Sequence, residues 1–170
     1  FARGATEHGA TFLRREVFAL RVADREIKIL TDADAVFASS VVVCLGAWSG
    51  PLLAPFGLRA PVAAVRGYHI QMPNAVPLAD APIVYSDKNI VVTPMNRRVR
   101  ATSYMEFSGA ADPADPRKAA WLRRCVRDFG YECADDAESW VGPRPVLPDY
   151  LPAMGRVATV PNLFYAFGHQ

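Results

Sequence analysis

The sequence has 170 residues, a length that suits one compact domain or parts of two, but not two full domains. Apolar residues make up 51% and charged residues 21%, which is the composition of a chain with a buried core and not of a disordered segment. The formal net charge is +2, from 19 Lys and Arg against 17 Asp and Glu. This near balance gives no general case for binding nucleic acid or an acidic membrane surface.

Cysteine and histidine patterns argue against a disulfide scaffold and against a metal site. The three cysteines include no C-x-x-C pair, and the three histidines lack the spacing of metal ligands. The longest apolar run, residues 35–48, is interrupted by Ser39, Ser40 and Gly46. It falls short of the roughly 20 apolar residues that span a bilayer, so no transmembrane segment is predicted.

Short strands are predicted in the first third of the chain. Apolar and charged residues mix in 17–22 and 26–29, with a turn at 23–25 between them. The run 41–45 is continuous and rich in β-branched residues, which is typical of a strand buried on both faces of a parallel sheet. It ends in residues 46–50, Gly-Ala-Trp-Ser-Gly, where the backbone must turn or approach another group closely.

An antiparallel sheet and one helix are predicted next. Asp115 suits the N-cap of the helix, Pro116 its first position and Gly130 its end. Apolar residues from Trp121 to Phe129 form a single stripe, which indicates ordinary core packing. The strand-like stretches of the sheet are 62–72, 83–85, 90–95 and 99–104, with turns at 73–74, 86–88 and 96–97.

The last part of the chain is rich in proline and then apolar. Four prolines from Pro143 to Pro152 predict a rigid extended segment, and residues 163–167 predict a short strand. The chain thus leaves one sheet, builds a second and returns to the first. We therefore predict a mixed α/β (α+β) fold with two interleaved domains, residues 1–50 with 153–170 and residues 51–152.

Arg144 is the first candidate for chemistry, because it lies between Pro143 and Pro145. A stiff backbone lowers the cost of ordering the side chain, and a guanidinium matches a carboxylate with two parallel hydrogen bonds. The alternative is an internal ion pair, for instance with Asp149. Tyr85 and Tyr104 could line a pocket, although packing at a sheet edge is more typical of such residues.

Four segments of the chain form an ordered pattern. They are Gly9 to Val17, Val41 through Leu45-Gly46-Ala47-Trp48-Ser49, Val65-Arg66-Gly67-Tyr68, and Gly142-Pro143-Arg144-Pro145 through Pro148-Asp149 and Pro152. Asn162-Leu163-Phe164 and Gly168-His169 complete the pattern. In this order the segments resemble the FAD-dependent D-amino-acid oxidase superfamily, and within it the bacterial D-amino-acid dehydrogenase branch. The resemblance covers nearly the whole chain.

The resemblance implies a role for each matching residue. The first domain would be part of a Rossmann-like FAD-binding domain, and residues 51–152 an antiparallel-sheet substrate domain. Arg144 would bind the α-carboxylate of an amino-acid substrate, and FAD would carry the redox chemistry. The implied FAD-binding residues are Val17 beside the adenine, Gly46, Ala47 and Trp48 near the dinucleotide, and Gly168 and His169 along the flavin and pyrophosphate.

The sequence departs from the family pattern at both ends. It contains no Gly-x-Gly-x-x-Gly, so the strand–turn–helix that cradles the FAD pyrophosphate is missing, as is the tail expected after His169. Phe1 in first position and the apolar ending also suggest a fragment. We expect this piece alone to bind FAD weakly or not at all, and to be inactive.

Two other functions stay open at this point. One is a glycine or sarcosine oxidase of the same superfamily, and the other is a non-catalytic substrate-domain module without a cofactor site. The resemblance also leaves the electron acceptor open between a quinone and oxygen. It implies a cytoplasmic protein, with peripheral attachment to the inner face of the bacterial membrane left open, and it gives no oligomeric state.

Overall fold

The structure is a computed structural model that describes residues 2–169. These residues form two compact units. Unit 1 runs through Cys44 and adds 49–60 and 154–166, and unit 2 consists of 45–48, 61–153 and the residues from Phe167 onward. The elements, in chain order, are α1 (Ala2–Glu7), β1 (Val17–Ala23), β2 (Glu26–Thr31), β3 (Val36–Ala38), β4 (Val41–Val43), a 3₁₀ helix (Gly46–Trp48), α2 (Ser49–Leu53), a second 3₁₀ helix (Ala54–Phe56), β5 (Ala63–Pro73), β6 (Ile83–Tyr85), β7 (Ile90–Met95), β8 (Arg98–Phe107), α3 (Pro116–Asp128), β9 (Ser139–Val146), β10 (Ala153–Arg156) and β11 (Leu163–Phe167).

Unit 1 contains an antiparallel sheet of β1, β2 and β3 in that order. The predicted turn between the first two strands is confirmed, since Ala23 pairs with Glu26 and leaves a two-residue loop. Asp24 in this loop has φ of 53°, a conformation that Asp tolerates better than most residues. The side chain of Ile27, in the middle strand β2, is completely buried.

A second sheet in unit 1 has the order β10-β11-β4, and β11 runs parallel to β4. The predicted strand at 163–167 is confirmed, and the one predicted at 41–45 is present over 41–43. The parallel sheet expected for the strand at 41–45 is confirmed by its pairing with β11. The prediction that this strand is buried on both faces is wrong: Val43 is buried, but Val42 is 58% exposed. The face of β4 that carries Val42 is therefore largely open to solvent in the part of the chain that the structure describes.

Unit 2 is built on a five-stranded antiparallel sheet with the order β6-β7-β8-β5-β9. All four predicted strands between 62 and 104 are confirmed, as are the turns between them. Pro143 and Pro145 lie in β9, which is the edge strand. That position suits proline, because an edge strand can lack backbone donors on its outer side.

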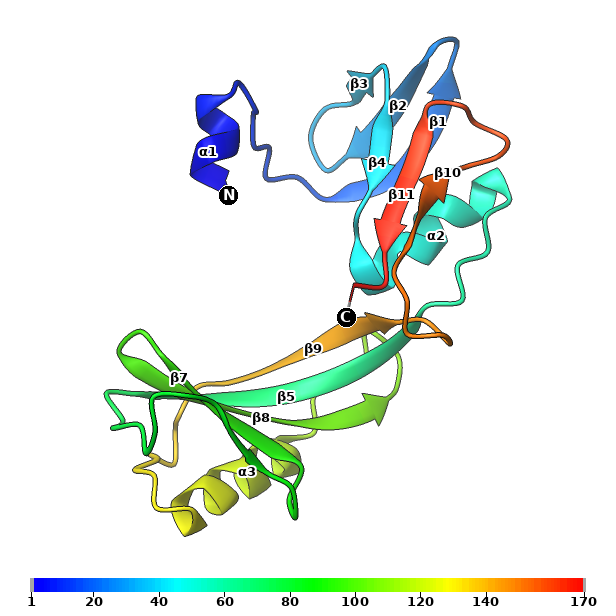
Figure 1. Cartoon of the computed structure of the whole chain (residues 1–170). Helices are drawn as coiled ribbons and strands as arrows, with labels where there is room; N and C mark the ends of the chain where they lie inside the picture. The colour runs from blue at the N-terminus through cyan, green and yellow to red at the C-terminus, as the bar shows by residue number, and fades with distance from the viewer. Residues whose placement is uncertain (1, 170) are drawn as a thin grey trace. The chain divides into compact units, whose positions relative to one another are not determined.

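Helix α3 covers one face of this sheet (Figure 1). Its predicted start is confirmed, since Asp115 adopts an extended conformation and its side chain accepts a hydrogen bond of 3.0 Å from the backbone N–H of Arg117. Leu122, Cys125 and Val126 are buried against the strands, as the apolar stripe predicted. The shared core also contains Ile70, Met72, Ile90, Val92, Val99, Ala101 and Tyr131.

Several short helices were not predicted, namely α1, α2 and the two 3₁₀ segments. None of them exceeds six residues, and such lengths are too short to show a helical apolar period. Within residues 2–169, no helix is both long and apolar enough to cross a membrane.

Candidate functional site

Two glycines face each other on neighbouring strands of unit 2. Gly67 of β5 pairs with Gly142 of β9, and both are buried. Side chains alternate along a strand, so Gly67 points away from the face on which Ile70 packs under α3. Because neither residue has a side chain, the open face of the sheet is bare at this point.

Two larger side chains of β9 fill this bare region. The guanidinium of Arg144 occupies the space that a Cβ on Gly67 would need, and the ring of Trp140 does the same at Gly142. Arg144 therefore lies flat across β5 from the edge strand. Its Nη1 atom donates a hydrogen bond of 3.2 Å to the carbonyl oxygen of Tyr104 on β8, the next strand in the sheet.

Arg144 is half-buried and, within the described residues, belongs to no ion pair. The alternative of an internal pair with Asp149 is therefore not realised. The Asp149 carboxylate instead accepts a hydrogen bond of 3.1 Å from the backbone N–H of Leu151. A guanidinium with a carbonyl as its hydrogen-bond partner still has donors and a full charge to offer a carboxylate.

The carbonyl that holds Arg144 lies at a bulge in β8. Arg66 pairs with Glu106 and Tyr68 with Ser103, so β8 has an extra residue opposite Gly67, whereas the pairing of β5 with β9 is continuous. Tyr104 in this bulge has φ of 70°, which is uncommon for a bulky residue. Its ring packs against Tyr68 and Trp121, at centroid distances of 5.5 and 5.2 Å.

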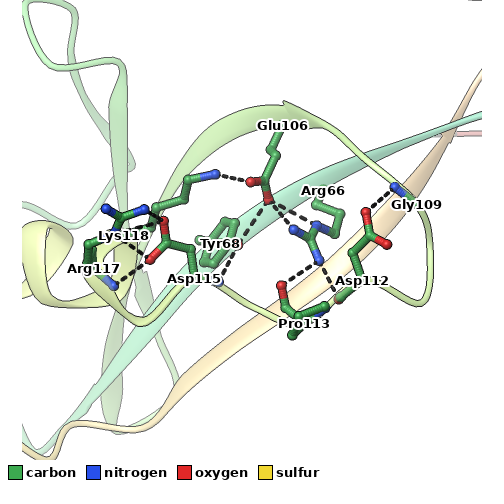
Figure 2. A network of polar contacts seen from close by, with 9 residues as sticks. All are labelled: Arg66, Tyr68, Glu106, Gly109, Asp112, Pro113, Asp115, Arg117 and Lys118. Carbon is green, nitrogen blue, oxygen red and sulfur yellow. Dashed lines mark hydrogen bonds and ion pairs between the residues drawn. The ribbon is translucent and has the colours of Figure 1, made fainter.

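A polar network fixes the strands on one side of the bulge (Figure 2). The Glu106 carboxylate accepts hydrogen bonds of 2.9 Å from Nε of Arg66 and from the hydroxyl of Tyr68, and it pairs with Lys118 of α3. Arg66 is 4% exposed, and it also donates to the carbonyl oxygens of Asp112 and Pro113. Together these contacts tie β5, β8 and the start of α3.

Two pKa values are shifted in this region, that of Glu106 by the network and that of Tyr104 mainly by burial. The ion pair with Lys118, followed by the hydrogen bonds from Tyr68 and Arg66, holds the pKa of Glu106 below its usual range. Burial is the main cause that raises the pKa of Tyr104, so its phenol is neutral at neutral pH. The Lys118 ammonium lies 5.2 Å from the ring of Tyr68 and 5.5 Å from that of Tyr104.

A pocket of about 780 Å³ opens beside Arg144. This volume suits a small molecule, and a mostly apolar wall with few polar groups is the usual character of such sites. Tyr85 and Tyr104 were both considered as pocket-lining residues from the sequence. Tyr104 lies in the wall of this pocket, whereas Tyr85 stacks on Phe129. The wall includes Arg144, Tyr104, Trp121, Val91, Met105 and Val146.

His69 lies on the same open face of β5, opposite Trp140, and the two rings stack at 5.0 Å. Partial burial, and then the charge of Arg100, lower the pKa of His69, while Glu138 acts in the other direction. The imidazole is therefore neutral at pH 7.

The predicted Gly46 and Gly168 both lie against the segment that carries Arg144. A Cβ on Gly46 would lie 3.6 Å from the ring of Pro145, and one on Gly168 would lie 2.5 Å from the Leu147 side chain. Both glycines have positive φ, 55° and 81°. The structure thus brings two of the predicted cofactor segments to the end of β9.

Two of the other predicted cofactor residues, Ala47 and Trp48, share a 3₁₀ helix with Gly46, and this helix contacts β9. Ala47 is half-buried and Trp48 is 54% exposed in the 3₁₀ helix, and His169 is exposed. Val17 lies in unit 1, half-buried at the start of β1. No cluster of His, Cys, Asp or Glu in residues 2–169 could hold a metal ion.

Comparison with known proteins gives one family for the whole chain. The profile described as "DAO: FAD dependent oxidoreductase" matches residues 1–170. A D-amino-acid oxidase of Bradyrhizobium diazoefficiens is 29% identical over 177 residues, with 99% of this chain and 41% of the relative covered. A D-amino acid dehydrogenase of Rhizorhabdus wittichii is 32% identical over 172 residues, with 97% and 41% covered.

Solved structures share the fold. Glycine oxidase from Geobacillus kaustophilus superposes with a TM-score of 0.81 at 26% identity, covering 99% of this chain and 46% of that one. Iminodiacetate oxidase from Chelativorans sp. BNC1 superposes with a TM-score of 0.76 at 23% identity, covering 98% and 47%. The chain spans less than half the length of these curated relatives and solved structures.

Proposed function

Because this chain belongs to the DAO family of FAD-dependent oxidoreductases, we propose that the protein carrying it oxidatively deaminates D-amino acids to 2-oxo acids and ammonia. The relatives named for D-amino acids support this choice of substrate. The single observation that carries the proposal is Arg144, a charged guanidinium that has no acidic partner among residues 2–169 and is held beside an apolar pocket. It is suited to the α-carboxylate that every amino-acid substrate presents.

Two glycines fit a dinucleotide cofactor in this structure. Parallel strands β4 and β11 are followed by Gly46 and Gly168, both with positive φ. Ligands of α/β sheets bind beyond the carboxyl ends of parallel strands, and glycine lets backbone N–H groups approach phosphate oxygens. We propose that Gly46, Ala47 and Trp48, with Gly168 and His169, contact FAD, and that Val17 lies beside its adenine.

The residues of this chain would bind and orient the substrate. Arg144 would fix the carboxylate, and the pocket wall of Trp121, Met105 and Val91 would exclude water from the side chain. Oxidation of the amine to an imine removes two electrons and two protons, and FAD supplies the electron acceptor when bound. Water then hydrolyses the imine, which releases ammonia and the 2-oxo acid.

The proposal is tested by anaerobic titration of the intact, flavin-loaded protein with D-alanine, with L-alanine as the matched control. We expect D-alanine to bleach the visible flavin absorbance and L-alanine to leave it unchanged. Bleaching by L-alanine alone, or by neither, would contradict the assignment to D-amino acids.

A second candidate is a glycine or sarcosine oxidase, which the TM-score of 0.81 to a glycine oxidase favours. These substrates have no side chain at Cα, so they would leave most of the pocket of about 780 Å³ empty. The same titration with glycine and sarcosine separates the two candidates. Bleaching by these substrates at lower concentrations than by D-alanine, D-valine or D-leucine would favour the second.

A further inference from the structure

We propose that the left-handed bulge at Tyr104 is the device that orients Arg144, which makes Tyr104 a positioning residue for the substrate carboxylate. This inference rests on the proposed function of Arg144. It assigns the role to the main chain of Tyr104, whose carbonyl oxygen accepts the hydrogen bond from Nη1 of Arg144 at 3.2 Å. This bond joins the side chain of a residue on β9 to the main chain of β8.

The side chain of Arg144 extends to a strand that is not its neighbour in the sheet. Arg144 lies on edge strand β9, and its guanidinium crosses Gly67 of β5 to arrive at β8. In a regular ladder the carbonyl groups of β8 lie in the plane of the sheet and bond to their neighbouring strands. A residue inserted by a bulge is left out of the ladder, so its carbonyl is free to accept a side-chain donor.

The backbone of Tyr104 has an uncommon conformation. Its φ of 70° lies in a region that is unfavourable for a residue other than glycine. Strained backbone of this kind persists where the surroundings fix it. Here both flanks of the bulge are fixed, by the pairing of Arg66 with Glu106 on one side and of Tyr68 with Ser103 on the other.

The polar network of Figure 2 explains why the bulge keeps its conformation. Glu106 follows Tyr104 by two residues, and its carboxylate is bonded to Arg66, Tyr68 and Lys118. The ring of Tyr104 packs between Tyr68 and Trp121. Rotation of Tyr104 to negative φ would have to break these contacts, and it would turn the carbonyl away from Arg144.

The test uses two variants that remove the same ring and differ in their tolerance of positive φ. Asn and Val have similar size, but Asn adopts the left-handed region readily and a β-branched residue does not. In the intact, flavin-loaded protein, the KM for D-alanine in Tyr104→Asn is the reference, because this variant loses the same ring from the pocket wall as Tyr104→Val does. Tyr104→Val should raise that KM roughly tenfold above the Asn variant, with flavin content and kcat much less affected.

Two controls separate the possible causes. Asn74→Val makes the same kind of change at another left-handed residue of unit 2, with φ of 61°, and it should leave KM unchanged. D-alaninamide lacks the carboxylate, so its KM should be equal in the Asn and Val variants. Equal KM values for D-alanine in Tyr104→Asn and Tyr104→Val, or an equal rise in Asn74→Val, would overturn the positioning role.

The outcome for Arg144→Ala distinguishes this inference from the proposed function. If Arg144→Ala leaves the KM for D-alanine unchanged, then the carboxylate site itself is wrong. If Arg144→Ala raises KM while the Asn and Val variants agree, then only the positioning role is wrong. Should Tyr104→Val not fold, the pair Tyr104→Gly and Tyr104→Ala replaces it, with the lower KM expected for Gly and equal values contradicting the inference.

Discussion

Gly67 and Gly142 face each other across β5 and β9, and the space above them is occupied by the side chains of Arg144 and Trp140. This pairing turns two glycines of the sequence into one feature of the sheet. Their lack of side chains lets a long cation and an aromatic ring lie flat against the backbone. The orientation of Arg144 therefore depends on a residue of a different strand.

Gly67→Ala is expected to impair substrate binding with little loss of stability. The added methyl group would meet the end of the flexible Arg144 side chain, which can move aside at small cost. Displacement of the guanidinium should raise the KM for D-alanine by roughly tenfold, while the urea midpoint changes little. Steady-state kinetics and urea unfolding of the same preparations measure both quantities.

Gly142→Ala is the matched control for that substitution. Its methyl group would meet the Trp140 ring, which is already 56% exposed and can swing toward solvent. The KM for D-alanine should stay within about threefold of wild type, since Arg144 is not displaced. A rise equal to that of Gly67→Ala would contradict the specific role of Gly67.

Glu106→Gln should lower stability at neutral pH and remove part of its acid sensitivity. Hydrogen bonds to charged groups contribute about 1.5–3 kcal/mol, and Glu106 accepts them from a buried arginine. The pKa of Glu106 is lowered in the folded state, so the folded state binds fewer protons than the unfolded chain. Its contribution is complete above the unfolded pKa of about 4.3 and is lost as pH falls through the lower folded value.

Urea unfolding at pH 7, 5, 4 and 3.5 measures this effect. The difference in free energy of unfolding between wild type and Glu106→Gln should be constant from pH 7 to pH 5 and should narrow below that. A difference that stays constant down to pH 3.5 would show that the pKa of Glu106 is not lowered in the folded state relative to the unfolded chain.

Leu122→Ala should destabilise the protein by about 2–5 kcal/mol, because Leu122 is completely buried between α3 and the sheet. Arg124→Ala is the control on the same helix, where the side chain is exposed, and its effect should stay within about 0.5 kcal/mol. Chemical denaturation of both variants checks the prediction. Equal effects would mean that the apolar stripe is not the packed face.

Much of unit 2 was predictable from local patterns. Asp115, Pro116 and the stripe through Leu122 predicted α3 and its core face, because capping and periodicity depend on neighbouring residues. Arg144 was identified by its flanking prolines and by family resemblance. The exposure of Val42 was not predictable, since burial of a strand depends on which segments cover it.

The contacts that orient Arg144 were also beyond sequence reasoning. The motifs around Gly67 and Gly142 were noted, but nothing local shows that the two glycines pair. Tyr104 was considered as a pocket wall, yet its role comes from a backbone conformation and not from its ring. A bulge arises from the register of two strands, and one strand read alone carries no sign of it.

We propose that Arg144 binds the substrate carboxylate, and the function assigned to the pocket depends on this role. The most direct measurement compares the KM for D-alanine and for D-alaninamide in wild type, Arg144→Lys and Arg144→Ala of the intact protein. Loss of the charge-assisted contact should cost on the order of 2–5 kcal/mol for D-alanine, a rise of about 30-fold or more, with Lys intermediate and the amide unaffected. An unchanged KM for D-alanine in Arg144→Ala, or an equal rise in KM for D-alaninamide, would show that Arg144 does not bind the carboxylate.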